Sequence, residues 1–164
     1  MIQLLVLDVD GCLTNGDIIY TSSGEEIKSF NVKDGLAIAS WIKLGGSCAI
    51  ITGRESAIVY KRASELGISH IYQGIKNKYA KLQEILKEEN LDLKNVAAIG
   101  DDLNDKRLLK SVKLSFTPND GVDEIKSTVD HILNSKGGKG AVREMIERIL
   151  KDENRFDEYL KIWD

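Results

Sequence analysis

Cysteine, proline and long apolar runs are scarce in this sequence, and their scarcity excludes several classes of protein. The two cysteines, Cys12 and Cys48, lack the spacing of a metal site, so we expect them to be small apolar fillers in a protein of a reducing compartment. No apolar run approaches the roughly 18 residues needed to span a bilayer, and no basic segment with an apolar core precedes the first expected strand. The sequence therefore predicts a cytoplasmic protein without a membrane-spanning segment.

An excess of charge of one sign is also missing. The 23 basic and 26 acidic residues are mixed along the chain and leave a net charge of -3. This balance offers no broad basic face for nucleic acid. The 164 residues, of which 42% are hydrophobic and 30% charged, are enough for one hydrophobic core and too few for two ordinary domains. We expect one globular domain that binds neither nucleic acid nor membrane.

What the sequence does contain is an alternation of apolar strands and amphipathic helices. After a first strand over 4–7, the segment 17–31 predicts a β-hairpin, because apolar runs flank Ser22-Ser23-Gly24. A helix over 35–44 follows, with Asp34 as its N-terminal cap. We then expect strands over 47–52, 70–73, 96–101, 112–116 and 131–133, and helices over 56–66, 78–89, 104–110, 121–127 and 140–150. Such alternation indicates an α/β fold, a Rossmann-like three-layer α/β/α arrangement with a parallel sheet.

Two aspartates, Asp8 and Asp10, come directly after the first apolar strand. If both lie on the strand they point to the same side, because side chains alternate with period two. At ~4 Å and an effective dielectric constant near 20, two such charges repel each other by roughly 4 kcal/mol. A bound cation or a functional site at this strand end would account for that cost. The alternative is ordinary turn or helix-cap chemistry, since Asp-Gly is also common in turns.

Polar residues also follow other expected strands. Thr52-Gly53-Arg54 follows one strand, Asp101-Asp102 follows another, and Lys78 opens a helix. Because ligands bind beyond the carboxyl ends of parallel strands, these residues and the two aspartates should line one crevice. Taken singly, Thr52 or Asp101 could cap a helix and Lys78 could be a solvated charge. Their convergence on one edge of the sheet favours a functional site.

These motifs, in this order, resemble those of the haloacid dehalogenase superfamily of phosphotransferases. The match consists of DVDGCLT, IITGR, GIKNKYAKL and GDDLND, and it extends over about residues 4–116. The resemblance implies that Asp8 attacks phosphorus to form an aspartyl-phosphate and that Asp10 is the general acid and base. It also implies a Mg²⁺ ion held by the side chains of Asp8 and Asp101 and by the backbone carbonyl of Asp10. These oxygen ligands suit Mg²⁺ better than zinc.

The same resemblance assigns the remaining polar residues to the surroundings of the phosphoryl group. Thr52 and the Gly53 amide would hold phosphoryl oxygens, and Lys78 would offset the negative charge of nucleophile and phosphate. Asp102 and Asp105 would orient water ligands and Lys78. The resemblance therefore predicts a complete set of phosphatase residues.

Many members of this superfamily carry a cap domain, for which the sequence has no room. Only the hairpin fills the first insertion point, and one helix and one strand fill the second, over 55–77. Such an open site would take a macromolecule or be closed by another subunit. We expect a single phosphatase domain over 1–151 without a cap domain. A tail over 152–164 either offers apolar surface beyond the core or packs on its own domain as a terminal helix.

Over nearly its whole length the chain resembles one capless family, the 3-deoxy-D-manno-octulosonate 8-phosphate phosphatases of lipopolysaccharide synthesis. The shared segments are DVDGCLTNG, FNVKDG, IITGRES, YQGIKNK, GDDLND and GGKGAVRE. This resemblance implies a homotetramer in which the hairpins associate and a neighbouring chain helps to enclose the site. It also implies a small acidic sugar phosphate as substrate, whose carboxylate would meet Arg54 and either Arg62 or Lys61. The loop over 137–140 could approach an anion, and Cys12 stands where a valine is expected.

Three other functions are compatible with parts of the sequence. A nonulosonate (sialate or KDN) 9-phosphate phosphatase would share the core, although that branch prefers an acidic residue in place of Arg54. A phospho-acceptor receiver module also uses Mg²⁺, acidic residues, a threonine and a lysine. The presence of Asp10, and the lack of an acidic residue at the end of the second strand, argue against a receiver. A catalytically inactive subunit would not need the intact set of residues.

Overall fold

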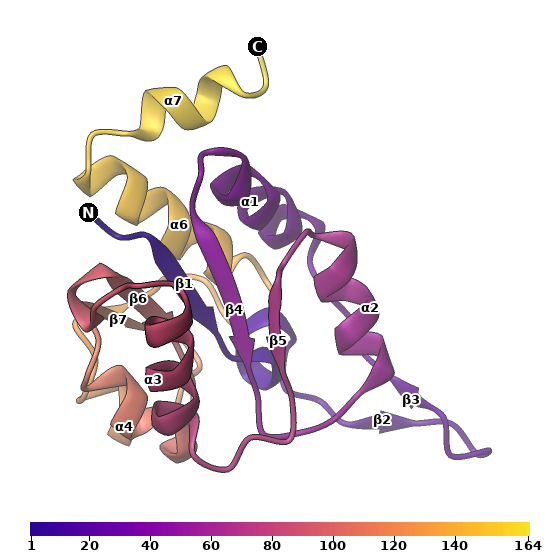
Figure 1. Ribbon diagram of the computed structural model, residues 1–164. Coiled ribbons are helices and arrows are strands. Elements are labelled where there is room, and N and C mark those ends of the chain that lie inside the picture. Colours follow the sequence, from indigo (N-terminus) through magenta and orange to yellow (C-terminus); the bar gives the residue numbers. More distant parts are fainter.

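Six parallel strands form the centre of the computed structural model, which describes residues 1–164 (Figure 1). The strands are β1 (Leu4–Leu7), β4 (Ser47–Ile51), β5 (His70–Tyr72), β6 (Val96–Ile99), β7 (Leu114–Thr117) and β8 (His131–Ile132). Their order across the sheet is β5-β4-β1-β6-β7-β8, so β1 lies in the interior with β4 and β6 as its neighbours. The expected parallel α/β fold is confirmed, and its first strand is central.

Helices cover both faces of the sheet. They are α1 (Val32–Lys43), α2 (Ala57–Glu65), α3 (Lys78–Glu88), α4 (Lys106–Leu109), α5 (Asp123–Lys126), α6 (Ala141–Asp152) and α7 (Phe156–Lys161). Leu5 and Leu7 belong to the core that includes α1, α2 and α6, whereas Leu4 and Val6 belong to the core that includes α3, α4 and α5. Alternating side chains of one strand thus enter two cores, which gives the expected three layers. None of these helices is long and apolar enough to cross a membrane.

The predicted start of the first helix is wrong by three residues. Helix α1 begins at Val32, because Asn31 is the cap and accepts a hydrogen bond from the Lys33 amide at 2.8 Å. Asp34 therefore lies inside the first turn, where it is buried and accepts a hydrogen bond from the Arg143 amide at 2.8 Å. This aspartate holds the first turn of α6 instead of capping its own helix.

The other boundaries differ by smaller amounts. The helix predicted over 104–110 is divided into a 3₁₀ turn, Leu103–Asp105, and α4. The strand predicted over 112–116 begins later, at Leu114. These shifts lie at element ends, where local propensity discriminates least.

The expected hairpin is present and no cap domain accompanies it. Strands β2 (Ile19–Tyr20) and β3 (Glu26–Ile27) pair antiparallel, with Ile19 opposite Ile27 and Tyr20 opposite Glu26. Figure 1 shows this short ribbon projecting from the body of the molecule, beyond the end of the sheet where β4 finishes. The hairpin is therefore available to approach residues at the carboxyl ends of the strands.

The tail packs on its own domain as a terminal helix, which was one of the two alternatives for residues 152–164. Tyr159 of α7 is buried in the core that includes α1 and α6. The Trp163 indole donates to Ser40 Oγ at 3.2 Å, and the Lys43 ammonium lies 4.8 Å from the centre of the Trp163 ring. Arg155 donates to the Leu44 carbonyl at 3.2 Å. These contacts fix residues 156–163 against α1, away from the hairpin in Figure 1.

The buried position of Asp34 predicts a pH-dependent stability difference. Burial raises the pKa of Asp34 above its ordinary 3.8, despite the hydrogen bond from the Arg143 amide, and Oδ2 has no partner. A raised folded-state pKa gives stability that is present below the unfolded pKa and lost as the pH rises through the folded value. An asparagine at this position cannot ionise, so the D34N variant should gain stability relative to the wild type between pH 4 and pH 7. Urea unfolding at both pH values measures the difference, and a pH-independent difference would contradict it.

Candidate active site

The polar residues of the sequence motifs meet at the carboxyl end of the sheet. Leu7 of β1 pairs with Ile50 of β4 and with Ile99 of β6, so the residues that follow these strands lie side by side. One crevice at this edge is lined by Asp8, Asp10, Gly16, Thr52, Gly53, Arg54, Asp101, Asp102 and Asn104. The structure brings the residues that follow the three strands together as expected, whereas Lys78 is buried and does not line the crevice. Gly16 and Asn104, which lie within DVDGCLTNG and GDDLND, also line it, although the sequence analysis gave them no role.

A buried ammonium connects two carboxylates on the floor of the crevice. Lys78, the first residue of α3, donates to Asp8 Oδ1 at 2.7 Å and to Asp105 Oδ1 at 2.6 Å. All three side chains are buried. Asn77 caps α3 by accepting from the Ala80 amide, which fixes where Lys78 begins the helix. Burial favours the neutral amine, but the charges of Asp8 and Asp105 raise the pKa of Lys78, so it is a cation.

The floor of the crevice carries more negative than positive charge. Burial and the charge of Asp105 raise the pKa of Asp8 to about 6. Burial, then the charges of Asp8 and Asp105, raise the pKa of Asp101 to about 8, and no hydrogen bond supports its ionised form. One ammonium therefore serves three carboxylates. An added divalent cation would remove this imbalance by neutralising Asp8 and Asp101.

The donor set at this point fits Mg²⁺. Ligand atoms of Asp8, Asp101 and Cys12 lie within 4.8 Å of one another. Burial, then the nearby carboxylates, raise the pKa of Cys12 well above 9.0, so its thiol stays protonated and is a poor ligand. The two carboxylates remain, and oxygen ligands suit a hard cation. Gly11 makes room for them: its φ is +93°, and a Cβ there would lie 1.9 Å from Asp101 Oδ2.

Asp10 lies in the crevice for a different reason from the one predicted. Strand β1 ends at Leu7, and the following turn places Asp10 at φ -73° and ψ 114°. The two aspartates therefore do not repeat along one strand. Asp10 instead extends toward the hairpin, where Lys28 Nζ lies 2.5 Å from Asp10 Oδ1. The side chain of Lys28 is only 1% exposed, and none of the sequence motifs contains this residue.

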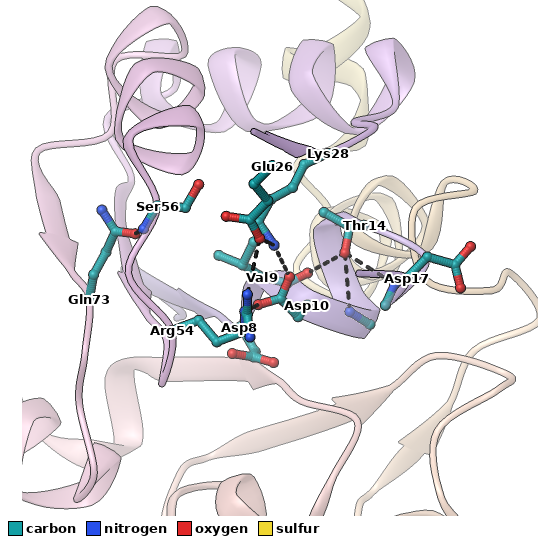
Figure 2. Close-up of polar contacts among 12 residues, drawn as sticks. Asp8, Val9, Asp10, Thr14, Asp17, Glu26, Lys28, Arg54, Ser56 and Gln73 are labelled. Atoms are coloured by element: carbon teal, nitrogen blue, oxygen red, sulfur yellow. Dashed lines mark hydrogen bonds and ion pairs between the residues drawn. The ribbon is translucent and has the colours of Figure 1, made fainter. Parts of the chain in front are cut away.

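Arg54 stands at the rim of the crevice, next to the hairpin (Figure 2). Its guanidinium donates to Glu26 Oε1 at 3.2 Å and to the Tyr20 hydroxyl at 3.4 Å, and Nε lies 3.9 Å from Asp10 Oδ2. Hydrogen bonds to Tyr20 and Glu26 raise the pKa of Arg54. Its side chain is 44% exposed, so it has room to meet a ligand. The period-two pattern of Glu26 and Lys28 is the sequence feature that could have revealed this group.

The acidic motif contributes residues with separate roles. Asp105 accepts from Lys78 and also from the backbone amide of Asp101 at 3.2 Å. Asp102 accepts from the Leu103 amide at 2.7 Å and is exposed at the crevice rim, without a contact to Lys78. Thr52, which is buried, and Gly53 follow β4 as predicted. Of these two aspartates, Asp105 orients Lys78, and the role of Asp102 toward water ligands stays a prediction.

Two expected cationic or anion-binding groups do not reach the crevice. Arg62 lies against α1, where its guanidinium occupies the space beside Gly35, and it pairs with Glu65 at 3.7 Å. The prediction that Arg62 meets the ligand is therefore wrong for the crevice of its own chain. In the loop over 137–140, the Gly138 amide donates to the Cys12 carbonyl at 2.9 Å, and a Cβ on Gly137 would lie 1.8 Å from the Gly11 carbonyl oxygen. This loop supports the turn around Gly11 from behind.

Comparisons with known proteins agree with this geometry. A family model described as haloacid dehalogenase-like hydrolase matches residues 63–146. The 3-deoxy-D-manno-octulosonate 8-phosphate phosphatase of Escherichia coli K12 is 40% identical over 96% of this chain and 84% of its own. The corresponding protein of Haemophilus influenzae is 36% identical over 94% of this chain and 86% of its own.

Solved structures show the same similarity. The 3-deoxy-D-manno-octulosonate 8-phosphate phosphatase of Moraxella catarrhalis, crystallised with magnesium ion, phosphate ion and KDO, has a TM-score of 0.96 and 42% identity, covering 99% of this chain and 94% of its own. The cobalt-bound Haemophilus influenzae phosphatase has a TM-score of 0.90 and 36% identity over 94% and 91% of the two chains. The chain therefore belongs to the haloacid dehalogenase-like hydrolases and, within them, to the family of the 3-deoxy-D-manno-octulosonate 8-phosphate phosphatases.

Proposed function

We propose that the protein is a Mg²⁺-dependent phosphatase that hydrolyses 3-deoxy-D-manno-octulosonate 8-phosphate to KDO and inorganic phosphate. The observation that carries this proposal is the buried Asp8, which Lys78 holds next to Asp101 at the floor of an open crevice. The similarity to phosphatases of that substrate supports the choice of sugar. Mg²⁺, held by Asp8, Asp101 and the backbone carbonyl of Asp10, would neutralise charge on the phosphate and on these carboxylates.

The residues of the crevice divide the reaction into two transfers. The carboxylate of Asp8 attacks phosphorus, and Lys78, which donates to its Oδ1, offsets the negative charge beside the phosphoryl group. The bond from phosphorus to the sugar oxygen breaks, and Asp10 gives that oxygen a proton. In the second transfer Asp10 takes a proton from water, the water oxygen attacks phosphorus, and the bond from phosphorus to Asp8 breaks. Thr52 and the Gly53 amide bind the phosphoryl oxygens throughout.

Phosphate release from candidate sugars tests this function. Purified protein with Mg²⁺ should release phosphate from the octulosonate 8-phosphate faster than from a nonulosonate 9-phosphate, and a chelator should abolish both reactions. Added Mg²⁺ should restore them. No turnover of either sugar phosphate would overturn the proposal, and faster turnover of the nonulosonate would reassign the substrate.

Arg54 should determine the affinity for the acidic sugar. If its guanidinium meets the substrate carboxylate, the R54A variant loses a charged hydrogen bond worth roughly 1.5–3 kcal/mol, and KM should rise about 10- to 100-fold with a smaller change in kcat. Steady-state kinetics measures both constants. R148A is the matched control, because Arg148 is exposed on α6, outside the crevice. An unchanged KM in R54A would refute the role.

We also propose a cytoplasmic homotetramer in which hairpins associate and a neighbouring chain encloses each site. The hairpin supports this, because Ile19, Tyr20 and Ile27 are between 43% and 60% exposed and offer apolar surface. Cys12 and Cys48, both buried and free, agree with a reducing compartment. Light scattering should give four times the 18.2 kDa chain mass, and a monomeric mass would contradict the closure by neighbours.

A further inference from the structure

The hairpin turns a charged face toward the crevice and an apolar face away from it. Glu26 lies in β3 and Lys28 follows two residues later, so both side chains point to the same side. Ile27, between them, is 48% exposed on the other side and pairs with Ile19 of β2. Figure 2 shows Lys28 directed at Asp10 from the hairpin and Glu26 beside it, directed at Arg54. The charged face of the hairpin therefore belongs to the active site.

The Lys28 ammonium contacts Asp10 and is shielded from the crevice. Its Nζ lies 2.5 Å from Asp10 Oδ1 and 3.2 Å from Glu26 Oε1. Its side chain is 1% exposed and does not line the crevice. Lys78, the other buried ammonium, contacts Asp8 and Asp105 instead. Each of the two aspartates of the first motif thus has its own lysine.

The geometry points to Lys28 as a positioning residue for proton transfer by Asp10. The inference rests on the proposed function, in which Asp10 gives a proton to the leaving sugar oxygen. Lys28 binds Oδ1 and so fixes the rotation of the carboxyl group, which leaves Oδ2 directed into the crevice near Arg54 Nε. Glu26 holds the lysine from the other side and also binds Arg54. The hairpin thereby connects Arg54, which binds the substrate carboxylate, to Asp10, which gives a proton to the leaving oxygen.

If Lys28 has this role, the effect of its loss on the rate depends on the leaving group. A sugar alcohol is a poor leaving group and needs the proton from Asp10, whereas nitrophenolate leaves readily without one. Loss of Lys28 should therefore impair hydrolysis of the sugar phosphate far more than hydrolysis of p-nitrophenyl phosphate. The ratio kcat/KM is the quantity to compare, because it covers the steps up to departure of the alcohol. A residue that only maintains the fold would impair both substrates equally.

The test uses the K28M variant, which keeps the length of the side chain and removes the ammonium. General acid catalysis contributes about 10²- to 10⁴-fold, so we expect kcat/KM for the sugar phosphate to fall at least about 30-fold and that for p-nitrophenyl phosphate less than about 5-fold. If K28M folds poorly, the double variant K28M/E26Q removes the lysine together with a carboxylate that it neutralises. It is compared with E26Q alone, because Glu26 also binds Arg54, and should show the same selective loss relative to E26Q. Circular dichroism reports folding, and K81M, which removes a surface ammonium paired with Glu84, is the control.

Equal losses on both phosphate esters, or no loss in either variant, would overturn the role of Lys28. These results differ from a failure of the proposed function. If the wild-type protein hydrolyses no sugar phosphate, the function is wrong. If the wild-type protein is active and the variants show no dependence on the leaving group, only the inference about Lys28 is wrong.

Discussion

We expect the D8N variant to fold and to bind its substrate but to release no phosphate. An amide oxygen is a poor nucleophile, so the aspartyl-phosphate cannot form, and we expect kcat to fall at least about 10⁴-fold. Folding should survive because asparagine has nearly the same shape and the substitution removes one of three crowded carboxylates. Lys78 keeps its second partner, Asp105, at 2.6 Å. Phosphate release measures the loss of activity, and urea unfolding measures stability.

Two controls distinguish the loss of the nucleophile from the loss of a negative charge. D123N removes an exposed aspartate at the first turn of α5 and should leave turnover unchanged. In chelator, where no cation offsets the carboxylates, the D8N variant should be at least as stable as the wild type, because burial and the charge of Asp105 raise the pKa of Asp8. Retained turnover in the variant would remove Asp8 as the nucleophile.

The sequence permits prediction of the site wherever a residue lies within two positions of the end of a central strand. Thr52 and Asp101 come at the ends of β4 and β6, and parallel pairing brings them next to Asp8 without further information. Lys78 is separated from Asp8 by 70 positions, yet its place as the first residue of a helix is enough to bring it to the same edge. Topology alone determines these positions, and topology is readable from the alternation of elements.

Residues whose direction depends on packing were not predictable. Lys61 and Arg62 are adjacent on α2, and a helical rotation of about 100° per residue leaves Lys61 exposed while Arg62 packs against α1. The contact between Lys28 and Asp10 could not be predicted, because it depends on how the hairpin folds back over the 18 positions between them. Asn31 and Asp34 are both of residue types that cap helices well. Asn31 caps α1, because the buried carboxylate of Asp34 accepts a hydrogen bond from the first turn of α6. In each case tertiary contacts determine the direction or the role of the side chain.

The K78M variant should lose both stability and activity, and a second substitution should separate the two. Removing one partner of a buried charge pair leaves the other charges without compensation, which costs roughly 3–5 kcal/mol of unfolding free energy. Asp8 and Asp105 each lose the ammonium that lies within 2.7 Å. Loss of the positive charge beside the phosphoryl group should also reduce kcat by about 10²- to 10³-fold. Urea unfolding in chelator and phosphate release with Mg²⁺ measure the two effects.

The double variant K78M/D105N makes this prediction decisive. It removes Lys78 together with one of its two carboxylates, so most of the lost stability should return, while turnover should stay low because nothing replaces the ammonium beside Asp8. The stability loss of K78M should also shrink in acid: without the ammonium the folded-state pKa values of the carboxylates rise further, and protonation then stabilises the folded state. If the double variant is as unstable as K78M at neutral pH, uncompensated charge is not the cause, and Lys78 acts mainly through the packing of its methylene chain.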